Sequence, residues 1–334
     1  MAHPTMEDVA RAAGVSRALV SLVINDSTNV SEERRRRVLD AAAQLGYRRN
    51  AVARQLASRR TRTIGVLLND LHNPFFAEIY DGVQAAAQAL GLRPLLTTAS
   101  RRSAGDIDAI EVMLEHRVDG MVLVSPRLPP AKIVAASDIV PIVVIGSVVK
   151  SQQVDSVTND EHEGARLVVR HLVELGHRAI THIHGGAGAG ALARWRGYEA
   201  AMRANNLVPD VIPGDFTESA GAEAARLLLK RKNRPTAIFG ANDMVAVGAL
   251  DVLESAGVRV PDDVSVVGYD NNFLARMHHI SLTSVDQSID QMGRSAIELL
   301  EERINTRRQT SELRLLTPTL VARRSTGPAR SVLS

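Results

Sequence analysis

The sequence predicts a small all-α head followed by an α/β body of two doubly wound, parallel-sheet lobes. Three observations lead to this fold class. The chain has 334 residues, which is too long for one ordinary core. Strand-like apolar runs alternate with helix-like segments from Ile64 onward, a pattern typical of parallel sheets covered by helices. Hydrophobic residues make up 45% of the chain but aromatic ones only 3%, which suits helices packed on buried strands.

The positive charge is concentrated in the first fifth of the chain. Residues 1–62 contain 12 arginines and 6 acidic residues, a formal charge of +6. The remainder contains 28 basic and 31 acidic residues, a formal charge of −3. A basic segment attached to a nearly neutral body is the pattern expected of a head that binds a polyanion.

Two short helices open the head. Thr5 precedes apolar residues at helical spacing and predicts a helix over residues 6–13 that ends at Gly14. Ser16 can cap a second helix over residues 17–25. Two short helices joined by a tight glycine turn form a helix-turn-helix.

A third helix and a basic linker complete the head. Ser31 is predicted to cap a helix over residues 32–46. Its run Arg34–Arg37 points all round the helix, so at most one or two of these side chains can touch one nucleic-acid backbone, and the others form a solvated face. The stretch AVARQLASRRTRT then reads as a short helix-capable segment that leads into the body.

The body contains two series of alternating segments. The first series comprises IGVLLN, PFFAEIYDGVQAAAQALG, RPLLTTA, EVMLEHR, DGMVLVSP, a Pro-rich connector LPPAKI, and IVPIVVIGS. The second comprises DEHEGARLVVRHLVELGH, AITHIHGG, ARWRGYEAAMRANN, a loop through PGDFTESAG, AEAARLLLKR, TAIFGAND, MVAVGALDVLESAG, VSVVGYD, IDQMGRSAIELLEERI and a final LRLLTPTLVARRST. Two series predict two lobes, and ligands of such sheets bind beyond the carboxyl ends of the strands.

Composition excludes several classes of protein. The chain has no cysteine, which rules out disulfides, thiolate metal sites and cysteine nucleophiles. Its first residues lack the apolar run of a signal peptide, and no later run reaches the roughly 18 apolar residues of a membrane span. We therefore expect a cytoplasmic protein that does not bind to membranes.

Several separate motifs resemble the lac/galactose repressor family, and they occur in the order found in that family. They are TMEDVARAAGVS, YRRNAVARQLA, IGVLLNDLHNPFF, LVELGHRAI, RWRGY, AIFGAND, GVRVPDDVSVVGYD and LVARRST, and together they cover nearly the whole chain. The resemblance implies a head of residues 1–48, a hinge helix and linker of residues 49–62, and a periplasmic-binding-protein-like core of residues 63–334. The implied lobes are residues 63–158 with 288–317, and residues 159–287 with 318–334.

The function that this resemblance implies is transcription regulation. The head would bind double-stranded operator DNA, and a small-molecule effector between the lobes would control its affinity. A sugar or sugar derivative is the expected effector, with a purine or another metabolite as the alternative. The residues after Arg324 are too few for an added tetramerising coiled coil, so we expect a homodimer. We expect this dimer to act as a repressor.

The resemblance places base contacts near the start of the second helix, which would lie in the major groove. Arg17 can bind a guanine through two hydrogen bonds, and Ala18 can contact a thymine methyl. Leu19 and Leu22 stand where the family commonly has threonine and arginine, so the operator sequence is not predicted. The candidate DNA-binding residues of the head are Thr5, Ser16, Arg17, Ala18, Ser21, Leu22 and Asn25.

The hinge supplies a second set of DNA-binding candidates. The resemblance implies that residues 50–58 become a helix only on DNA and insert Leu56 into the central minor groove. An apolar wedge of this kind unstacks one base step and bends the duplex. Read in isolation, Leu56 would be an ordinary core leucine. The candidates are Asn50, Ala53, Leu56 and Ala57.

The same resemblance assigns the effector site to strand ends and loops. Carboxylate, amide and guanidinium groups suit vicinal hydroxyls, and a phenyl ring offers a flat apolar face. The aromatic residues can instead belong to the lobe cores, the Asn and Asp can cap helices, and the Arg can form a surface ion pair. The candidates are Phe75, Ser125, Arg194, Phe216, Asn242, Asp270 and Gln287.

The sequence also bears on the charge of the effector. A purine or a phosphosugar is the alternative to a sugar. Six residues before Arg194 stands Gly188, at a family position where a cation would favour a carboxylate- or phosphate-rich ligand. The glycine therefore argues against an anionic effector.

Four rival functions are less well supported. The run HGGAGAGA matches a dinucleotide fingerprint, but Asp210, the acidic residue about 20 positions on, follows Pro209 in a predicted loop. His182 and His184 share a strand face without a third metal ligand, and no G-x-S-x-G elbow occurs. A sugar-binding transport component would need an export signal and no basic head. We therefore expect no enzyme, no cofactor and no metal.

Overall fold

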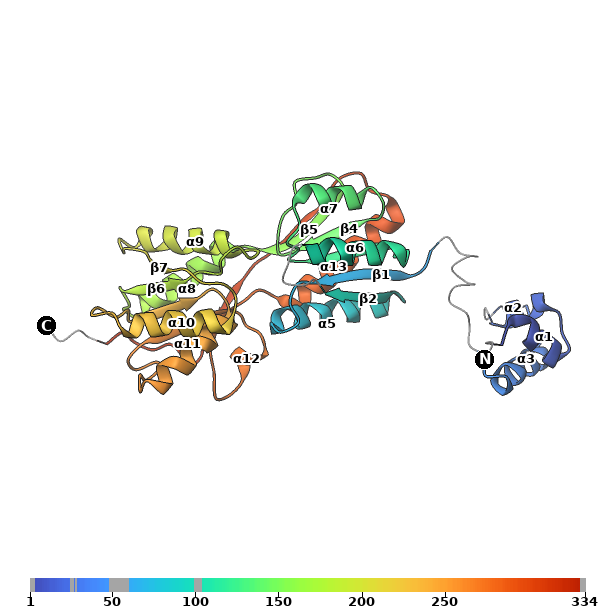
Figure 1. Ribbon diagram of the computed structural model, residues 1–334, viewed down its shortest axis with the longest axis horizontal. Coiled ribbons are helices and arrows are strands. Elements are labelled where there is room, and N and C mark those ends of the chain that lie inside the picture. The colour runs from blue at the N-terminus through green and yellow to red at the C-terminus, as the bar shows by residue number, and fades with distance from the viewer. Residues whose placement is uncertain (1–3, 25–26, 28, 48–59, 99–103, 331–334) are drawn as a thin grey trace. The chain divides into compact units, whose positions relative to one another are not determined.

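The computed structural model describes residues 4–24, 27, 29–47, 60–98 and 104–330. The chain divides between Thr61 and Arg62 into two compact units, a helical head and an α/β body. The body contains two lobes, each built on its own sheet (Figure 1). This is the fold class that the sequence predicts.

The head consists of three helices around a small apolar core. Their bounds are α1 (Met6–Ala13), α2 (Arg17–Ile24) and α3 (Glu32–Gln44). Val9, Val20 and Val38, one from each helix, are fully buried against one another. The turn between α1 and α2 is made by Gly14, whose φ of 63° is costly for any residue with a Cβ. The predicted helix-turn-helix is therefore confirmed.

Polar side chains cap the first two helices as predicted. The Thr5 hydroxyl accepts a hydrogen bond from the Asp8 amide at 3.3 Å, and the Asp8 carboxylate accepts one from the Thr5 amide at 2.9 Å. These two bonds form a capping box. The Ser16 hydroxyl accepts from the Leu19 amide at 3.3 Å at the start of α2.

The start of α3 differs from the prediction. Ser31 occupies the N-cap position, but its side chain makes no capping hydrogen bond. Glu32 and Glu33 lie in the first turn, where their charges favour the positive end of the helix. The start of α3 is therefore stabilised by charge, and the prediction that the Ser31 side chain caps it was wrong.

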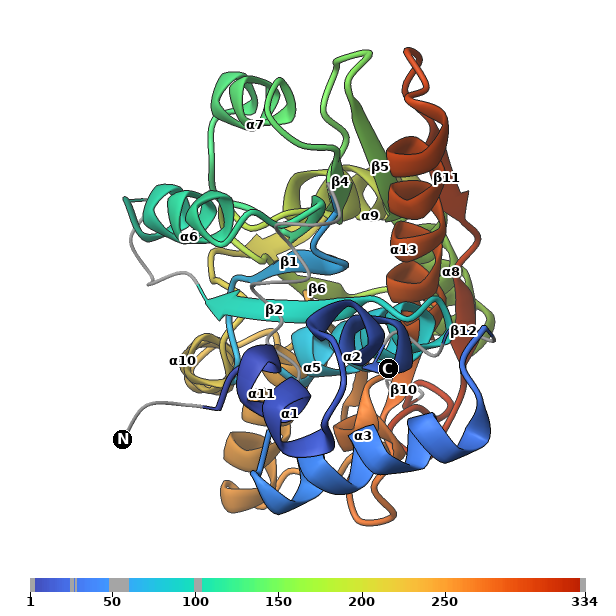
Figure 2. The same cartoon turned by 90° about the vertical axis from the view of Figure 1, so that its right-hand side faces the viewer.

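The first lobe is built on a parallel sheet with the strand order β11-β5-β4-β3-β1-β2. Figures 1 and 2 show this lobe with its covering helices. Its strands are β1 (Thr63–Leu68), β2 (Arg93–Thr98), β3 (Gly120–Val124), β4 (Ile142–Ile145), β5 (Val154–Asn159) and β11 (Leu313–Leu316). Two helices cover each face: α5 (Pro74–Ala89) with α13 (Ile289–Thr306), and α6 (Ala104–Glu115) with α7 (Pro130–Ser137).

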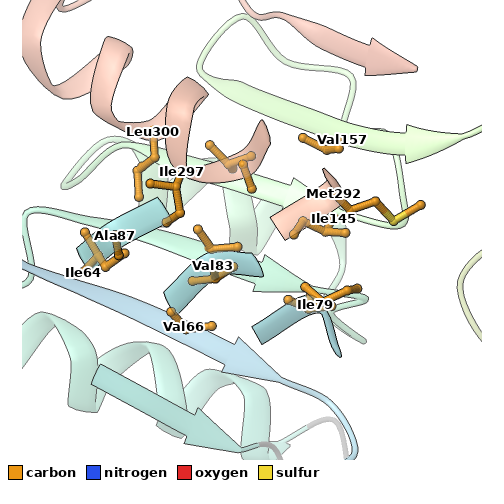
Figure 3. Close-up of a cluster of buried hydrophobic side chains, with 14 of the residues drawn as sticks. Ile64, Val66, Ile79, Val83, Ala87, Ile145, Val157, Met292, Ile297 and Leu300 are labelled. Atoms are coloured by element: carbon orange, nitrogen blue, oxygen red, sulfur yellow. The ribbon is translucent and has the colours of Figure 1, made fainter. Parts of the chain in front are cut away.

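Alternating strand residues supply the two cores of this lobe. Val66 of β1 packs with Val83 of α5 and Ile297 of α13 (Figure 3). Its neighbour Leu67 packs on the other face with Met113 of α6. Because successive side chains of a strand point to opposite faces, a strand covered on both sides is apolar throughout. This explains the continuous apolar runs in the sequence.

The second lobe repeats this plan with the strand order β12-β10-β9-β8-β6-β7, in which β12 alone pairs antiparallel. Its strands are β6 (Ile180–Ile183), β7 (Asp210–Ile212), β8 (Ala237–Gly240), β9 (Ser265–Asp270), β10 (Thr283–Asp286) and β12 (Thr319–Val321). Its helices are α8 (Glu161–Glu174), α9 (Ala191–Ala204), α10 (Glu218–Leu229), α11 (Asp243–Ser255) and the short α12 (Phe273–Arg276). The pair α8 and α9 packs on one face, and the pair α10 and α11 on the other.

Glycines allow one helix pair in each lobe to pack at backbone distance. A Cβ at Gly82 of α5 or Gly293 of α13 would clash with the backbone of the other helix. Gly221 of α10 and Gly248 of α11 stand in the same relation. Any larger residue at these four positions would push the helices apart.

Several elements differ from the sequence prediction. The predicted Pro-rich connector contains α7, because Pro130 stands in the first turn, where a missing amide hydrogen costs nothing. The predicted loop at Asp210 is the short strand β7, which Asp210 begins rather than closes. The final run, predicted as one segment, divides into β11 and β12, which belong to different sheets.

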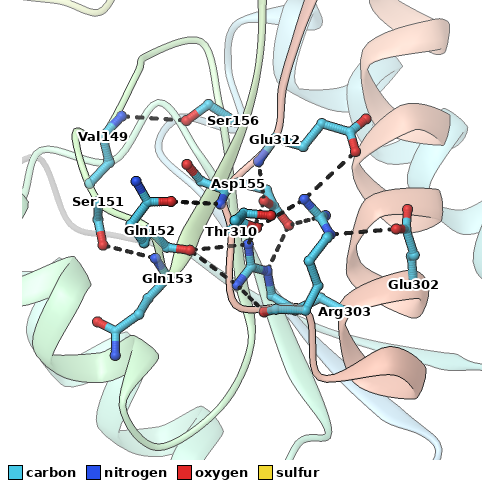
Figure 4. Close-up of polar contacts among 12 residues, drawn as sticks. Val149, Ser151, Gln152, Gln153, Asp155, Ser156, Glu302, Arg303, Thr310 and Glu312 are labelled. Carbon is cyan, nitrogen blue, oxygen red and sulfur yellow. Dashed lines mark hydrogen bonds and ion pairs between the residues drawn. The ribbon is translucent and has the colours of Figure 1, made fainter.

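The strand β5 was not predicted because its sequence, VDSVTN, is polar. It is nevertheless buried along its whole length, since its polar groups have partners. Asp155 accepts hydrogen bonds from Arg303 Nε at 2.8 Å and Nη2 at 2.6 Å, from Arg308 at 3.0 Å, and from the Glu312 amide at 2.7 Å (Figure 4). This ion pair fastens the end of α13 to the sheet.

Candidate DNA interface and effector site

The predicted base-contacting residues lie on the outer side of α2. Val20 and Val23 face the core of the head. The residues that are exposed are Ser16, Arg17, Ala18 and Leu22, and Ser21 is half-buried. The structure therefore brings one continuous set of predicted contacts to the surface of a single helix. Such a surface can enter a major groove.

Of the other predicted DNA contacts, only Thr5 belongs to the described residues. The Thr5 hydroxyl donates to the Asp8 carboxylate at 2.7 Å, so Thr5 already serves the start of α1. The remaining candidates lie outside the described residues, and they are Asn25, Asn50, Ala53, Leu56 and Ala57.

The arginine run of α3 has two roles. Arg37 donates to the Ala13 carbonyl at 2.7 Å, at the negative end of α1, and Arg35 donates to the Ser27 carbonyl. Arg34 and Arg36 are exposed. Two of the four guanidinium groups thus hold the head together, and the exposed pair can reach a phosphate backbone.

In the first lobe, the candidate effector residues follow strand ends. Ser125 comes directly after β3 with a left-handed φ of 49°, and its carbonyl accepts a hydrogen bond from Asn69 Nδ2 at 2.6 Å. Asn69, which sequence reasoning missed, follows β1 and is buried, and its Oδ1 has no hydrogen-bond partner among the described residues. Phe75 lies half-buried in the first turn of α5, edge-on to Phe76 at 5.3 Å between ring centroids. These groups share the carboxyl edge of the sheet.

In the second lobe, Arg194 forms a buried ion pair. Its Nε and Nη2 atoms lie 2.9 and 2.8 Å from Oε2 of Glu161, and both side chains are shielded from solvent. Its guanidinium also lies over the Tyr269 ring, 3.5 Å from the centroid, and donates to the Ala241 carbonyl. The predicted alternative of a surface ion pair is therefore wrong, because the pair is buried.

Phe216 and Asn242 lie beside Arg194. The Asn242 side chain caps α11 by accepting from the Val245 amide at 2.9 Å, and it donates to the Phe216 carbonyl at 3.2 Å. The Phe216 ring is 5.7 Å from the Arg194 guanidinium. A Cβ at Gly188 would overlap the Phe216 ring, so the glycine lets the loop cross its face. Asn242 therefore serves as a helix cap while its amide group stays next to the predicted site.

Asp270 and Gln287 are joined directly. Gln287 Nε2 donates to Asp270 Oδ1, and both side chains are buried. Asp270 ends β9 with a φ of 109°, and it does not cap α12, because Asn272 does so by accepting from the Leu274 amide at 3.0 Å. The geometry fixes the Asp270 carboxylate at a strand end with its amide partner.

A second buried carboxyl lies near Asp270. Asp243 accepts from the Ser284 hydroxyl at 2.6 Å and from the Asn272 amide at 2.9 Å. Burial raises the pKa of Asp243 to about 7. Burial and the neighbouring Asp243 both raise the pKa of Asp270. Burial also raises the pKa of Glu161, against the opposing effect of Arg194.

Sequence reasoning missed three members of this cluster: Glu161, Asp243 and Tyr269. In the sequence, Glu161 and Asp243 look like ordinary acidic residues in the first turn of a helix. Tyr269 stands in GYD as one more strand residue. Only the tertiary fold, which brings α8, α11 and β9 together, makes them neighbours of Arg194 and Asp270.

The two lobes contact each other beside this cluster. Glu78 of α5 accepts hydrogen bonds from the Phe273 amide at 2.7 Å and from Arg276 at 2.9 Å, both in α12. The chain passes between the two sheets after β5, after β10 and between β11 and β12. Exposed polar contacts such as this one can open and close as the lobes move.

His182 lies in β6 and His184 directly follows that strand. In the described part of the chain, no group of three or more His, Cys, Asp or Glu side chains is arranged to hold a metal ion. His182 is buried with Nδ1 2.9 Å from the Phe239 carbonyl, and burial lowers its pKa to about 3, so its ring is neutral. A hollow of about 400 Å³ between α8 and residues 318–322 contains none of the predicted effector residues.

Each of the described helices is too short or too polar to cross a bilayer.

Comparison with known proteins connects both units to one family. Residues 5–50 match the family model described as bacterial regulatory proteins, lacI family, and residues 169–326 match the model of a periplasmic binding protein-like domain. The HTH-type transcriptional repressor PurR of Erwinia tasmaniensis is 36% identical, with 98% of each chain covered. Catabolite control protein A of Priestia megaterium is 34% identical, covering 96% of this chain and 99% of its own.

Solved structures agree in fold. The Lac repressor bound to ONPG in the repressed state superposes with a TM-score of 0.88 at 29% identity and covers 97% of this chain and 100% of its own. The transcriptional regulator CelR in complex with cellobiose gives a TM-score of 0.73 at 35% identity and covers 96% of this chain and 99% of its own. The head, the two-lobed body and these relatives lead to one conclusion: the chain belongs to the lacI family of bacterial regulatory proteins and is a DNA-binding transcriptional repressor.

Proposed function

We propose that this repressor responds to a purine or a related small metabolite that binds at the strand ends around Arg194 and Asp270. The support is twofold. Relatives named PurR match nearly the whole chain, at up to 36% identity. The Phe216 ring offers a flat face for a heteroaromatic base, and the Asp270 carboxyl group offers an acceptor for its N–H groups.

The proposed organisation follows the family. Residues 1–48 bind the operator, residues 49–62 form the hinge, and residues 63–334 bind the effector and join a second copy of the chain. In the homodimer two heads would meet a pseudo-palindromic operator. Effector binding that favours one arrangement of the lobes over another would change operator affinity, with a coupling of about 1 to 3 kcal/mol.

A sugar, which the sequence favours over a purine, becomes the second candidate effector, because the PurR relatives support a purine better. It is supported by the cellobiose complex of CelR, which is 35% identical to this chain. The carboxylate of Asp270 and the amide of Asn242 can bind hydroxyls as well as ring nitrogens. The two candidates thus differ in what Phe216 contributes, a stacking surface for a base or an apolar face for a sugar ring.

The effector is tested by thermal denaturation of the full chain with hypoxanthine, guanine, adenine, ribose and cellobiose. A ligand at about 100 times its Kd stabilises the folded protein by about 2.7 kcal/mol. We expect a purine to raise Tm and the variant Asp270→Asn to reduce that rise. A rise with a sugar and none with any purine would replace the first candidate with the second.

The DNA-binding role is tested by selecting operators from a random duplex library. Replacing Arg17 with alanine removes a guanine contact, so discrimination at one base pair should fall by about 1 to 3 kcal/mol. The matched control is Arg36→Ala, exposed on α3, which should weaken all duplexes evenly and lower the salt dependence. Binding without any sequence preference in the intact protein would contradict the proposal.

A further inference from the structure

The positive charge of Arg194 is already compensated by groups of the protein itself. Its Nε and Nη2 atoms bind one carboxylate oxygen of Glu161 at 2.9 and 2.8 Å, and Nη1 donates to the Ala241 carbonyl. The face of the guanidinium is covered by Tyr269 at 3.5 Å. Only 3% of Arg194 is exposed to solvent. An anionic ligand would have to displace Glu161 to form the paired hydrogen bonds that arginine makes with phosphate or carboxylate.

The groups around Arg194 are acidic rather than basic. Asp243 and Asp270 are both buried, and neutral hydroxyl and amide groups donate to them. The nearby guanidinium of Arg323 is directed to the Leu282 carbonyl and to the side chain of Asn271. Three buried carboxyls therefore accompany the one buried guanidinium. A ligand with hydrogen-bond donors matches this environment, whereas a ligand anion would lie beside three carboxyl groups and a guanidinium that Glu161 already binds.

Glu161 is held in place by the segment that links the lobes. It is the first residue of α8, directly after β5 and the turn at Asp160. Asn159 at the end of β5 donates to the Tyr269 hydroxyl at 2.9 Å, and the Tyr269 ring covers Arg194. Contacts that run from Asn159 through Tyr269 to Arg194 thus hold Arg194 next to Glu161.

We infer that Glu161 is a positioning residue that neutralises Arg194 and thereby sets the specificity of the effector site for uncharged or cationic, donor-rich ligands over phosphorylated or carboxylated ones. This inference rests on the proposed function for the location of the site. It names a residue outside the predicted set and a chemical class for the effector. It also implies that Glu161, rather than Arg194 alone, decides whether an anion can bind.

The test uses inorganic phosphate as the probe and the fluorescence of Trp195, the single tryptophan of the chain, as a local readout beside Arg194. At constant ionic strength against chloride, wild type should show no saturable phosphate response. Glu161→Gln should gain one, and Glu161→Gln combined with Arg194→Gln should lose it. The matched control is Glu163→Gln on the same helix, whose carboxylate pairs with the half-exposed Arg166 at 2.6 Å and should behave as wild type.

Two results would overturn the inference. One is a saturable response of wild type that disappears in Arg194→Gln, and the other is a folded Glu161→Gln protein, checked by circular dichroism, without any response. If Glu161→Gln does not fold, the affinity of the wild-type protein is measured for two pairs of ligands. These are guanosine with guanosine monophosphate, and ribose with ribose 5-phosphate. We expect at least tenfold weaker binding of each phosphorylated member, and equal or tighter binding would also overturn the inference. The phosphate response does not require a purine or sugar effector, so a failure of the proposed effector class is seen separately.

Discussion

Two buried arginine–carboxylate pairs, one in each lobe, do different things. In the first lobe, Asp155 receives four hydrogen bonds from Arg303, Arg308 and a backbone amide. In the second lobe, Glu161 binds Arg194, and Asp243 and Asp270 lie nearby with only neutral donors. The first pair belongs to a network of two arginines and three carboxylates, because Arg308 also contacts Glu302 and Glu312 at 3.4 and 3.6 Å. The second has one arginine for its three carboxyls.

The difference separates a structural clamp from the proposed effector site. Arg303 also donates to the carbonyls of Arg308 and Thr310, so the first pair is closed on all sides and fastens α13 to β5. The second pair is surrounded by carboxyls whose pKa values burial raises. Groups that a fold leaves poorly compensated are typical of functional sites.

The largest effect is expected from breaking the first pair. Asp155→Ala leaves Arg303 and Arg308 without their buried counter-ion and should lower the free energy of unfolding by about 3 to 5 kcal/mol, measured by urea denaturation. Glu298→Gln, which removes an exposed partner of Arg314, is the control and should cost at most about 1 kcal/mol. A loss below that of the control would show that Asp155 is not a clamp.

Breaking the second pair should cost less. Arg194→Gln removes hydrogen bonds to a charged group, worth about 1.5 to 3 kcal/mol, but the raised pKa of Glu161 lets this carboxyl take up a proton. The loss should therefore grow as the pH rises. Arg166→Gln, from an exposed pair on the same helix, should change stability by no more than about 1 kcal/mol. A loss as large as that of Asp155→Ala and independent of pH would remove the distinction between the two pairs.

The pH dependence of stability reports the excess of carboxyls in the second lobe. The pKa of Asp243 is raised by burial from 3.8 to about 7, so the folded protein favours its protonated form. Its contribution to stability is complete below about pH 4 and is lost as the pH rises through about 7. Asp243→Asn carries no charge and should flatten the change of Tm over this range. An unchanged profile in the variant would assign the pH dependence to other groups.

The smallest effect is expected at the contact between the lobes. Glu78→Gln weakens a partly exposed pair with Arg276 and should lower the free energy of unfolding by less than about 1 kcal/mol. Because Glu78 and Arg276 belong to different lobes, the variant should nevertheless change the affinity for the effector, measured by calorimetry with whichever ligand raises Tm. Equal affinities in variant and wild type would show that this contact does not favour one arrangement of the lobes.

The sequence by itself determined the class of fold and the helix-turn-helix. Apolar periodicity and continuous buried runs depend on nearest neighbours along the chain, so residues such as Val20 and Val66 could be placed without a structure. The family motifs brought Arg194, Asp270 and Asn242 to attention for the same reason, because each stands within a short characteristic segment. Polar or proline-containing segments were misread, as at β5 and α7.

Only the tertiary structure decided which polar groups compensate one another. Asp155 and Arg303 are 148 residues apart, and Glu161 and Arg194 are 33 apart, so no local pattern links them. Burial turns such distant pairs into strong constraints, since an ionised group that leaves water needs a partner at hydrogen-bond distance. The sequence supplies the charged residues of this protein, and the packing of its strands and helices determines which of them compensate one another.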